Sequence, residues 1–176
     1  VGDDGVDGYR GDLSRNAGTI AEALKASGYN TYMSGKWHVA HSLKENSNWP
    51  RQRGFDDYYG IISGCANYYN PATLKQNNNA IQAESDDFFL TDAISDEAVR
   101  QITEHNASGT GAPFFQYIAY TAPHWPLHAH ADDIAKYRGR YDRGWDRLRE
   151  AASRAWRPWV SRDWYPGRLR NRGSDR

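Results

Sequence analysis

Hydrophobic residues recur with a helical period near the start of the chain and again in its second half. Residues 19–28 form the first such segment, where Thr19 and Glu22 make a capping box. The apolar face expected for this helix contains Ile20, Ala23 and Leu24. Gly28 supplies the left-handed residue that ends a helix. The second helix is predicted from about Thr91 to His105, with an apolar stripe made of Ile94, Ala98, Val99 and Ile102.

Two further segments have the pattern of strands. Residues 29–34 are rich in aromatic and β-branched side chains, and Gly35 is expected to form a turn after them. Residues 113–121 are almost continuously apolar, which is typical of a strand buried on both faces in a parallel sheet. A third, short strand is expected near Ile61 and Ile62. Helix, short link and strand follow one another, so the pattern predicts an α/β fold.

Polar segments separate these elements. Residues 1–16 are rich in Gly and Asp and are predicted to be loop. Residues 53–71 combine aromatic residues with glycine and are expected to form an ordered loop region around the short strand. Residues 74–87 include three consecutive asparagines and are expected to form a surface excursion.

The 176 residues are 39% hydrophobic, enough for one sizeable core. The chain has 22 basic and 22 acidic residues, so no global field indicates nucleic acid or an acidic membrane as partner. Up to Tyr137 acidic residues outnumber basic ones by 17 to 10, whereas the remainder has 12 arginines and five acidic residues.

The single cysteine, Cys65, excludes an internal disulfide. No apolar run is long enough to span a membrane. The chain opens on Val1, so a targeting segment could lie upstream.

Two polar turns that follow predicted strands carry the candidate chemistry. Gly35-Lys36-Trp37-His38 places a fixed positive charge and a titratable imidazole one residue apart. Ala122-Pro123-His124-Trp125-Pro126 places a histidine between two prolines that stiffen the turn. In open α/β sheets, ligands bind outside the carboxyl ends of the strands. These turns therefore predict an oxyanion site, although a solvated lysine and structural histidines are the plain alternative.

The first turn and its surroundings resemble a signature of the sulfatase family. The resemblance includes the capped helix, Gly28, the strand, Gly35-Lys36-Trp37-His38 and the downstream Arg53-Gly54-Phe55-Asp56. The His124 turn and the following segment to Tyr137 extend it, so that it covers Gly8 to about Arg149 and is closest to bacterial arylsulfatases. One departure is Ala40, where the family usually has glycine. The resemblance implies an alkaline-phosphatase-like mixed sheet flanked by helices, present here as a partial domain.

The resemblance also implies roles for three residues. Lys36 and His124 would bind the sulfate ester, and His124 would assist the leaving group as a general acid. His38 would act as a base when sulfate is expelled. The family uses calcium and a formylglycine nucleophile made from cysteine or serine. The substrate would be a sulfated small molecule or a sulfated glycan, and family members are often exported.

Parts of the family pattern are missing from this sequence. The nucleophile belongs to a cysteine-x-proline-x-arginine segment, whereas Cys65 is followed by Ala66 and Asn67 and is expected to be a small buried residue. Asp3 and Asp4 follow no buried strand and are interpreted as loop residues, so no metal ligand is assigned. The chain is therefore expected to be an internal piece of a sulfatase: residues 1–150 form part of the catalytic domain, and this piece alone is expected to be inactive.

Residues 151–176 form a tail rich in Arg and Trp. This tail has three interpretations: a nucleic-acid-binding arm, a disordered solvated tail or a shifted reading frame. We favour the last.

Other hypotheses concern the whole chain: a phosphate or phosphonate monoester hydrolase of the same superfamily, or a non-catalytic glycan-binding module. The module would present a stacking surface made of Trp49, Tyr58, Tyr59, Tyr68, Tyr69 and Trp125. A metal site could be built from His124, His128, His130, Asp132 and Asp133, but a solvated loop is the stronger interpretation.

Overall fold

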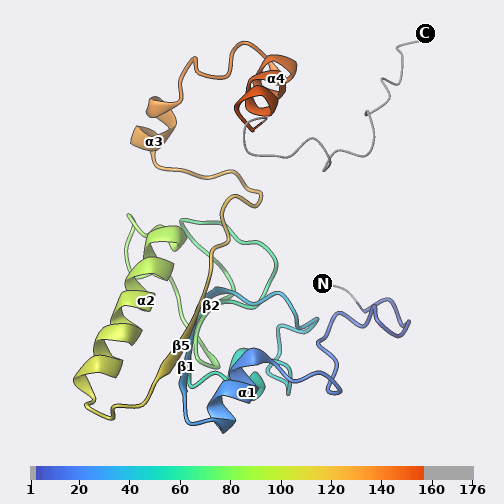
Figure 1. Cartoon of the computed structure of the whole chain (residues 1–176), viewed down its shortest axis with the longest axis vertical. Helices are drawn as coiled ribbons and strands as arrows, with labels where there is room; N and C mark the ends of the chain where they lie inside the picture. The colour runs from blue at the N-terminus through green and yellow to red at the C-terminus, as the bar shows by residue number, and fades with distance from the viewer. Residues whose placement is uncertain (1–2, 157–176) are drawn as a thin grey trace. The chain divides into compact units, whose positions relative to one another are not determined.

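The chain divides into two units, Val1–His128 and Ala129–Arg176, and the computed structural model describes residues 3–156. The first unit contains helices, a 3-10 turn and strands in the order α1 (Ile20–Ala26), β1 (Asn30–Lys36), η1 (Pro50–Arg53), β2 (Asp57–Ile61), β3 (Leu74–Gln76), β4 (Asn79–Ala80), α2 (Leu90–Ala107) and β5 (Phe114–Ala119). The second unit contains α3 (Ala131–Lys136) and α4 (Trp145–Trp156) (Figure 1).

The strands form one mixed sheet with the order β4-β3-β2-β1-β5. Strand β1 pairs in parallel with β2 on one side and with β5 on the other. Strands β2, β3 and β4 pair antiparallel. The α/β class and the mixed sheet predicted from the sequence are thus confirmed. Because β1, β2 and β5 run in the same direction, the segments that follow them emerge at one edge of the sheet.

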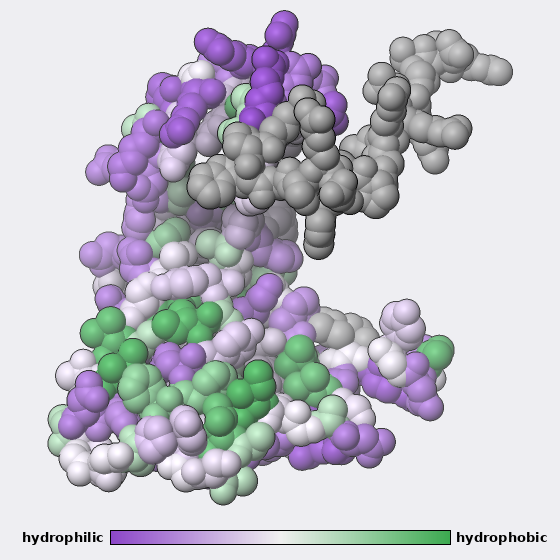
Figure 2. Space-filling view, in the orientation of Figure 1, coloured by the Kyte–Doolittle hydropathy of each residue, from purple (hydrophilic) through white to green (hydrophobic). Residues whose placement is uncertain are grey.

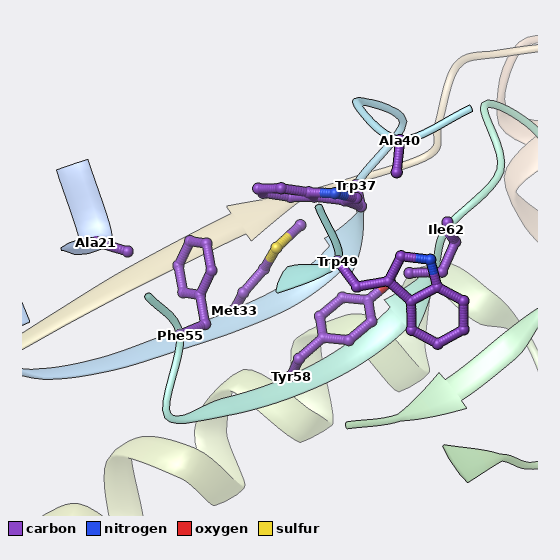
Figure 3. Close-up of a cluster of buried hydrophobic side chains, with 8 residues drawn as sticks. All are labelled: Ala21, Met33, Trp37, Ala40, Trp49, Phe55, Tyr58 and Ile62. Atoms are coloured by element: carbon purple, nitrogen blue, oxygen red, sulfur yellow. The ribbon is translucent and has the colours of Figure 1, made fainter. Parts of the chain in front are cut away.

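Each face of the sheet is covered by its own cluster of buried side chains. One cluster joins Ala21 of α1 to Met33 of β1 and Tyr58 of β2, with Trp37, Ala40, Trp49, Phe55 and Ile62 (Figure 3). The other joins Leu90 and Ile94 of α2 to strand and loop residues Tyr59, Ile61, Tyr68, Leu74, Phe88 and Phe89. Consecutive residues of β2 alternate between the clusters, as the pleat of a strand requires. Helices α1 and α2 therefore flank opposite faces.

Gly35 lies inside β1, whereas the sequence predicted a turn there. Its φ is +124°, and a Cβ at this position would lie 2.0 Å from the carbonyl oxygen of Ala119 in β5. Gly60 of β2 is paired with Gly35, and a Cβ on Gly60 would lie 1.8 Å from the Gly35 oxygen. The three parallel strands approach too closely here for any side chain. The glycine serves close backbone packing and not chain reversal.

The capping box of α1 is confirmed, but the predicted apolar face of this helix is wrong. The Glu22 N–H donates to Thr19 Oγ1 over 3.0 Å, and the Thr19 N–H donates to Glu22 Oε2 over 2.7 Å. Ala21 is buried, whereas Ile20 is 66% exposed. A helix of seven residues has too few positions for its period to identify the buried side.

The second predicted helix exists and is slightly longer than expected. Its buried face contains Leu90, Ile94, Ala98, Gln101 and His105, spaced by three or four residues. Val99, which the sequence assigned to this face, is exposed. One helical position corresponds to a rotation of about 100°, so the residue after Ala98 points away from the sheet.

Strand β5 was predicted to be buried on both faces, and this was wrong. It lies at the end of the strand order, next to β1, and Phe114, Tyr117 and Ile118 are about 40% exposed. The expected surface excursion of residues 74–87 was also wrong in part. It contains the β3–β4 hairpin, and Leu74 of β3 is buried.

The two helices of the second unit are exposed. Neither α3 nor α4 contains a buried residue, and mainly hydrophilic residues cover them in Figure 2. The sequence predicted an Arg- and Trp-rich tail at residues 151–176. Its part from position 157 onward lies outside the described residues. Within the described part of the chain, no helix is both long and apolar enough to cross a membrane.

Candidate active site

Lys36 is the last residue of β1, at the edge where the three parallel strands end. It is paired with Ile61, the last residue of β2. The neighbouring Trp37 is buried, and its ring nitrogen donates to the carbonyl oxygen of Asn48 over 2.8 Å. Lys36 Nζ forms no ion pair or hydrogen bond with the side chains of residues 3–156. Its charge is therefore available to an anion.

His38 follows at a sharp change of backbone direction. Its φ is +54°, and its N–H donates to the carbonyl oxygen of Ile62 over 3.1 Å. Burial lowers the pKa of the His38 imidazole, and the positive charges of Lys36 and His124 lower it further. The imidazole is thus held in its neutral, proton-accepting form at neutral pH.

His124 follows the neighbouring strand β5. Its Nδ1 lies 2.6 Å from the carbonyl oxygen of Trp125, which makes Nδ1 the protonated nitrogen and leaves Nε2 for a ligand. Buried Tyr68 fixes the turn, because its hydroxyl donates to the carbonyl oxygen of His124 over 2.9 Å. The N–H of Tyr68 also donates to His128 Nδ1 over 3.3 Å. A core residue therefore holds the backbone of this exposed histidine.

Lys36 ends β1, His38 follows it and His124 follows β5, and these parallel neighbours end at one edge of the sheet. An open cavity of about 400 Å³ lies beside His38 and is lined in part by Tyr9, Asp12 and Leu13. The site thus contains the ammonium of Lys36, the neutral imidazole of His38, and His124 with its Nε2 available to a ligand. The cavity beside His38 could hold that ligand.

Sequence reasoning missed two parts of this site. The ring of His38 lies against Gly64, where a Cβ would be 2.3 Å from its Nε2 and Cε1. Asp12 holds the loop after His38, because its carboxylate accepts from the N–H of His41 and contacts His41 Nδ1, each over 2.8 Å. The rule that ligands bind after parallel strands could have found Gly64, since it follows β2.

Cys65 is exposed, and the expectation that it is buried was wrong. It lies in the loop after β2, where its carbonyl oxygen accepts from Ser63 Oγ over 2.9 Å. Asp3 and Asp4 lie in a loop, and Asp3 accepts from the Gly5 N–H over 2.8 Å. Within residues 3–156, no group of three or more His, Cys, Asp or Glu is placed to hold a metal ion.

The aromatic residues proposed as a stacking surface lie mainly in the core. Four of the six are buried: Trp49, Tyr58, Tyr59 and Tyr68. Tyr69 is 36% exposed and Trp125 is 72% exposed. The interpretation as a glycan-binding module loses most of its predicted surface, because these side chains hold the two faces of the sheet.

The Sulfatase family model matches residues 4–172, so the chain belongs to the sulfatase family. Similar curated proteins include an uncharacterised sulfatase of Schizosaccharomyces pombe, 32% identical over an alignment 161 residues long that covers 83% of this chain and 28% of that protein. The arylsulfatase of Klebsiella aerogenes is 30% identical over 80% of this chain and 31% of its own length. The chain thus spans less than a third of either relative.

Solved structures have a similar fold. The crystal structure of Ps i-CgsB in complex with k-i-k-neocarrahexaose matches 72% of this chain and 31% of that protein, with a TM-score of 0.62 and 31% identity. The structure of a PsFucS1 sulfatase from Pseudoalteromonas has a TM-score of 0.50 at 18% identity and supports the fold alone. The alkaline-phosphatase-like sheet expected from the sequence is thus found in its solved relatives.

Proposed function

We propose that this chain contributes Lys36, His38 and His124 to the active site of an arylsulfatase-type sulfuric ester hydrolase. Membership of the sulfatase family supports the reaction class. The observation that carries the proposal is that all three residues lie at or after the ends of β1 and β5, which are parallel neighbours in the sheet. Such an edge is where open α/β sheets bind their ligands.

Lys36 binds the sulfate oxygens in this proposal. A sulfuryl group in transfer spreads negative charge over its oxygens, so a fixed ammonium stabilises the transition state more than the ground state. The side chain is suited to this because it has no ion-pair partner within residues 3–156. A carboxylate partner would cancel part of its charge before the substrate arrived.

The two histidines divide the proton transfers. His38 accepts a proton in the step that releases sulfate, because burial keeps its imidazole neutral at neutral pH. His124 presents Nε2 to the ester oxygen and donates a proton to the leaving alcohol. The carbonyl oxygen of Trp125 accepts from Nδ1 and fixes the ring orientation that this donation requires.

The nucleophile and the calcium site lie outside the residues that this sequence contains. A formylglycine would supply the attacking oxygen, and calcium would neutralise the sulfate. Neither is provided by Cys65, which lacks the motif, or by a cluster of carboxylates within residues 3–156. We therefore expect the 176-residue chain alone to hydrolyse no aryl sulfate.

The substrate in this proposal is a sulfated small molecule or a sulfated glycan. The complex of Ps i-CgsB with k-i-k-neocarrahexaose supports the second of these, since that protein is 31% identical to this chain. The cavity beside His38 contains aromatic and carboxylate side chains, Tyr9 and Asp12 among them. An aromatic ring packs against apolar faces, and a carboxylate accepts from hydroxyl groups.

A chimeric enzyme tests the proposal directly. The segment from Asp4 to Arg149 would replace its counterpart in the Klebsiella aerogenes arylsulfatase, which supplies the remaining segments. We expect a folded chimera to hydrolyse p-nitrophenyl sulfate faster than p-nitrophenyl phosphate. A folded chimera with the opposite preference would favour the phosphate or phosphonate monoester hydrolase, and one without either activity would contradict the proposal.

A further inference from the structure

The loop after β2 forms a backbone wall beside the imidazole of His38. The segments after β1 and β2 run side by side, because the N–H groups of Trp37 and His38 donate to the carbonyl oxygens of Ile61 and Ile62 over 2.9 and 3.1 Å. Gly64 comes two residues later. A Cβ on Gly64 would lie 2.3 Å from Cε1, 2.3 Å from Nε2 and 2.7 Å from Cδ2 of His38.

These three atoms form the outer end of the imidazole ring, which includes the nitrogen that exchanges protons. A carbon–carbon contact is favourable at about 3.5–4.0 Å, so no side chain fits at position 64 while the ring keeps its place. Unlike Gly35 and Gly60, Gly64 does not have a left-handed φ. Its backbone would accept alanine without strain, so the ring of His38 is the obstacle.

We propose that Gly64 is a positioning residue that sets the orientation of the His38 imidazole and shields one side of it from water. The backbone of His38 is fixed at one end by its hydrogen bond to Ile62, and Gly64 limits the other end of the side chain. Its catalytic consequence rests on the proposed sulfatase function. The contact itself can be measured without any enzymatic activity.

The variant Gly64→Ala tests the contact in the full 176-residue chain. The added methyl group should push the ring toward solvent with little loss of stability, because a side chain can rotate away. Burial of the ring would then decrease, and the NMR titration midpoint of His38 should rise toward 6.5, the ordinary value. Gly18→Ala is the matched control, since its Cβ would have no neighbour closer than 3.8 Å. His38→Ala assigns the resonance.

The same substitutions in the chimeric enzyme test the consequence for catalysis. A ring displaced by about 1 Å should reduce kcat for p-nitrophenyl sulfate by up to ~100-fold. KM should change little, because His38 does not bind the ester in the ground state. In a chimera that already carries His38→Ala, Gly64→Ala should not change kcat further, because there is no imidazole left for the methyl group to displace.

The outcomes separate the two proposals. An unchanged His38 resonance and midpoint in Gly64→Ala would overturn the positioning role. A displaced ring with unchanged kcat in an active chimera would overturn its importance for catalysis. A displaced ring in the chain, with a chimera that is inactive even with glycine at position 64, would contradict the sulfatase proposal and still support the contact.

Discussion

Replacing Gly35 by alanine should destabilise the sheet at the position from which the candidate site emerges. Two separate effects contribute. Gly35 has a φ of +124°, and holding an alanine in such a region costs about 1–3 kcal/mol. Its Cβ would also lie 2.0 Å from the Ala119 oxygen, so β5 must move by more than ~1 Å to reach an ordinary contact of about 3.3 Å.

The collision can be given a magnitude. Overpacking of this kind costs about 1–3 kcal/mol, and a lost β1–β5 ladder hydrogen bond costs about 1 kcal/mol. Together with the backbone strain, Gly35→Ala should lower the free energy of unfolding by about 3–7 kcal/mol, a large share of the roughly 5–15 kcal/mol that stabilises a whole domain. Gly28→Ala isolates the strain, because Gly28 has a φ of +87° and its Cβ would meet nothing within 4 Å. It should cost about 1–2 kcal/mol.

Urea unfolding followed by tryptophan fluorescence measures both variants, since Trp37 and Trp49 are buried in the core. We expect Gly35→Ala to unfold at much lower urea than Gly28→Ala, or not to fold at 25 °C. Equal losses in the two variants would refute the close approach of β1 and β5, because strain alone would then explain both.

Three further predictions concern the core and the site. Arg53→Leu should lower the free energy of unfolding by about 3 kcal/mol in urea titrations, because this buried guanidinium donates to Glu22 over 2.9 Å; exposed Arg51→Leu should change it by less than about 0.5 kcal/mol. Neutral His38 should make its full contribution to the free energy of unfolding above pH 6.5, and this contribution should be lost as the pH falls through the lowered pKa of the folded state. If the free energy of unfolding of His38→Ala depends on pH in the same way, the effect does not come from His38. Trp49→Ala should cost about 3–5 kcal/mol in the same titration, and a comparable loss in Arg51→Leu would contradict the contrast between buried and exposed positions.

The sequence predicted the elements that depend on local signals. The capping box of Thr19 and Glu22 and the left-handed Gly28 require only neighbouring residues, and both are found. The Lys36, His38 and His124 segments could be placed together because parallel strands end at a common edge. Which strands were neighbours was not visible in the sequence, since pairing joins residues far apart along the chain.

The errors have the same origin. Gly35 was interpreted as a turn residue because its local sequence is polar, whereas its role is set by Ala119 and Gly60 in other strands. The apolar sequence of β5 indicated burial on both faces, but its position at the end of the sheet exposes Tyr117. The contact between Gly64 and His38 likewise depends on the parallel course of two loops.

Lys36, His38 and His124 are proposed to serve one sulfate-ester site. The most direct measurement is kcat/KM for p-nitrophenyl sulfate in the chimera and in its Lys36→Ala variant, with Lys75→Ala as a control for loss of a lysine. We expect Lys36→Ala to lower kcat/KM by about 100-fold or more while the protein stays folded, since one donor to a developing oxyanion has about that effect. Equal kcat/KM values for Lys36→Ala and the unsubstituted chimera would contradict it.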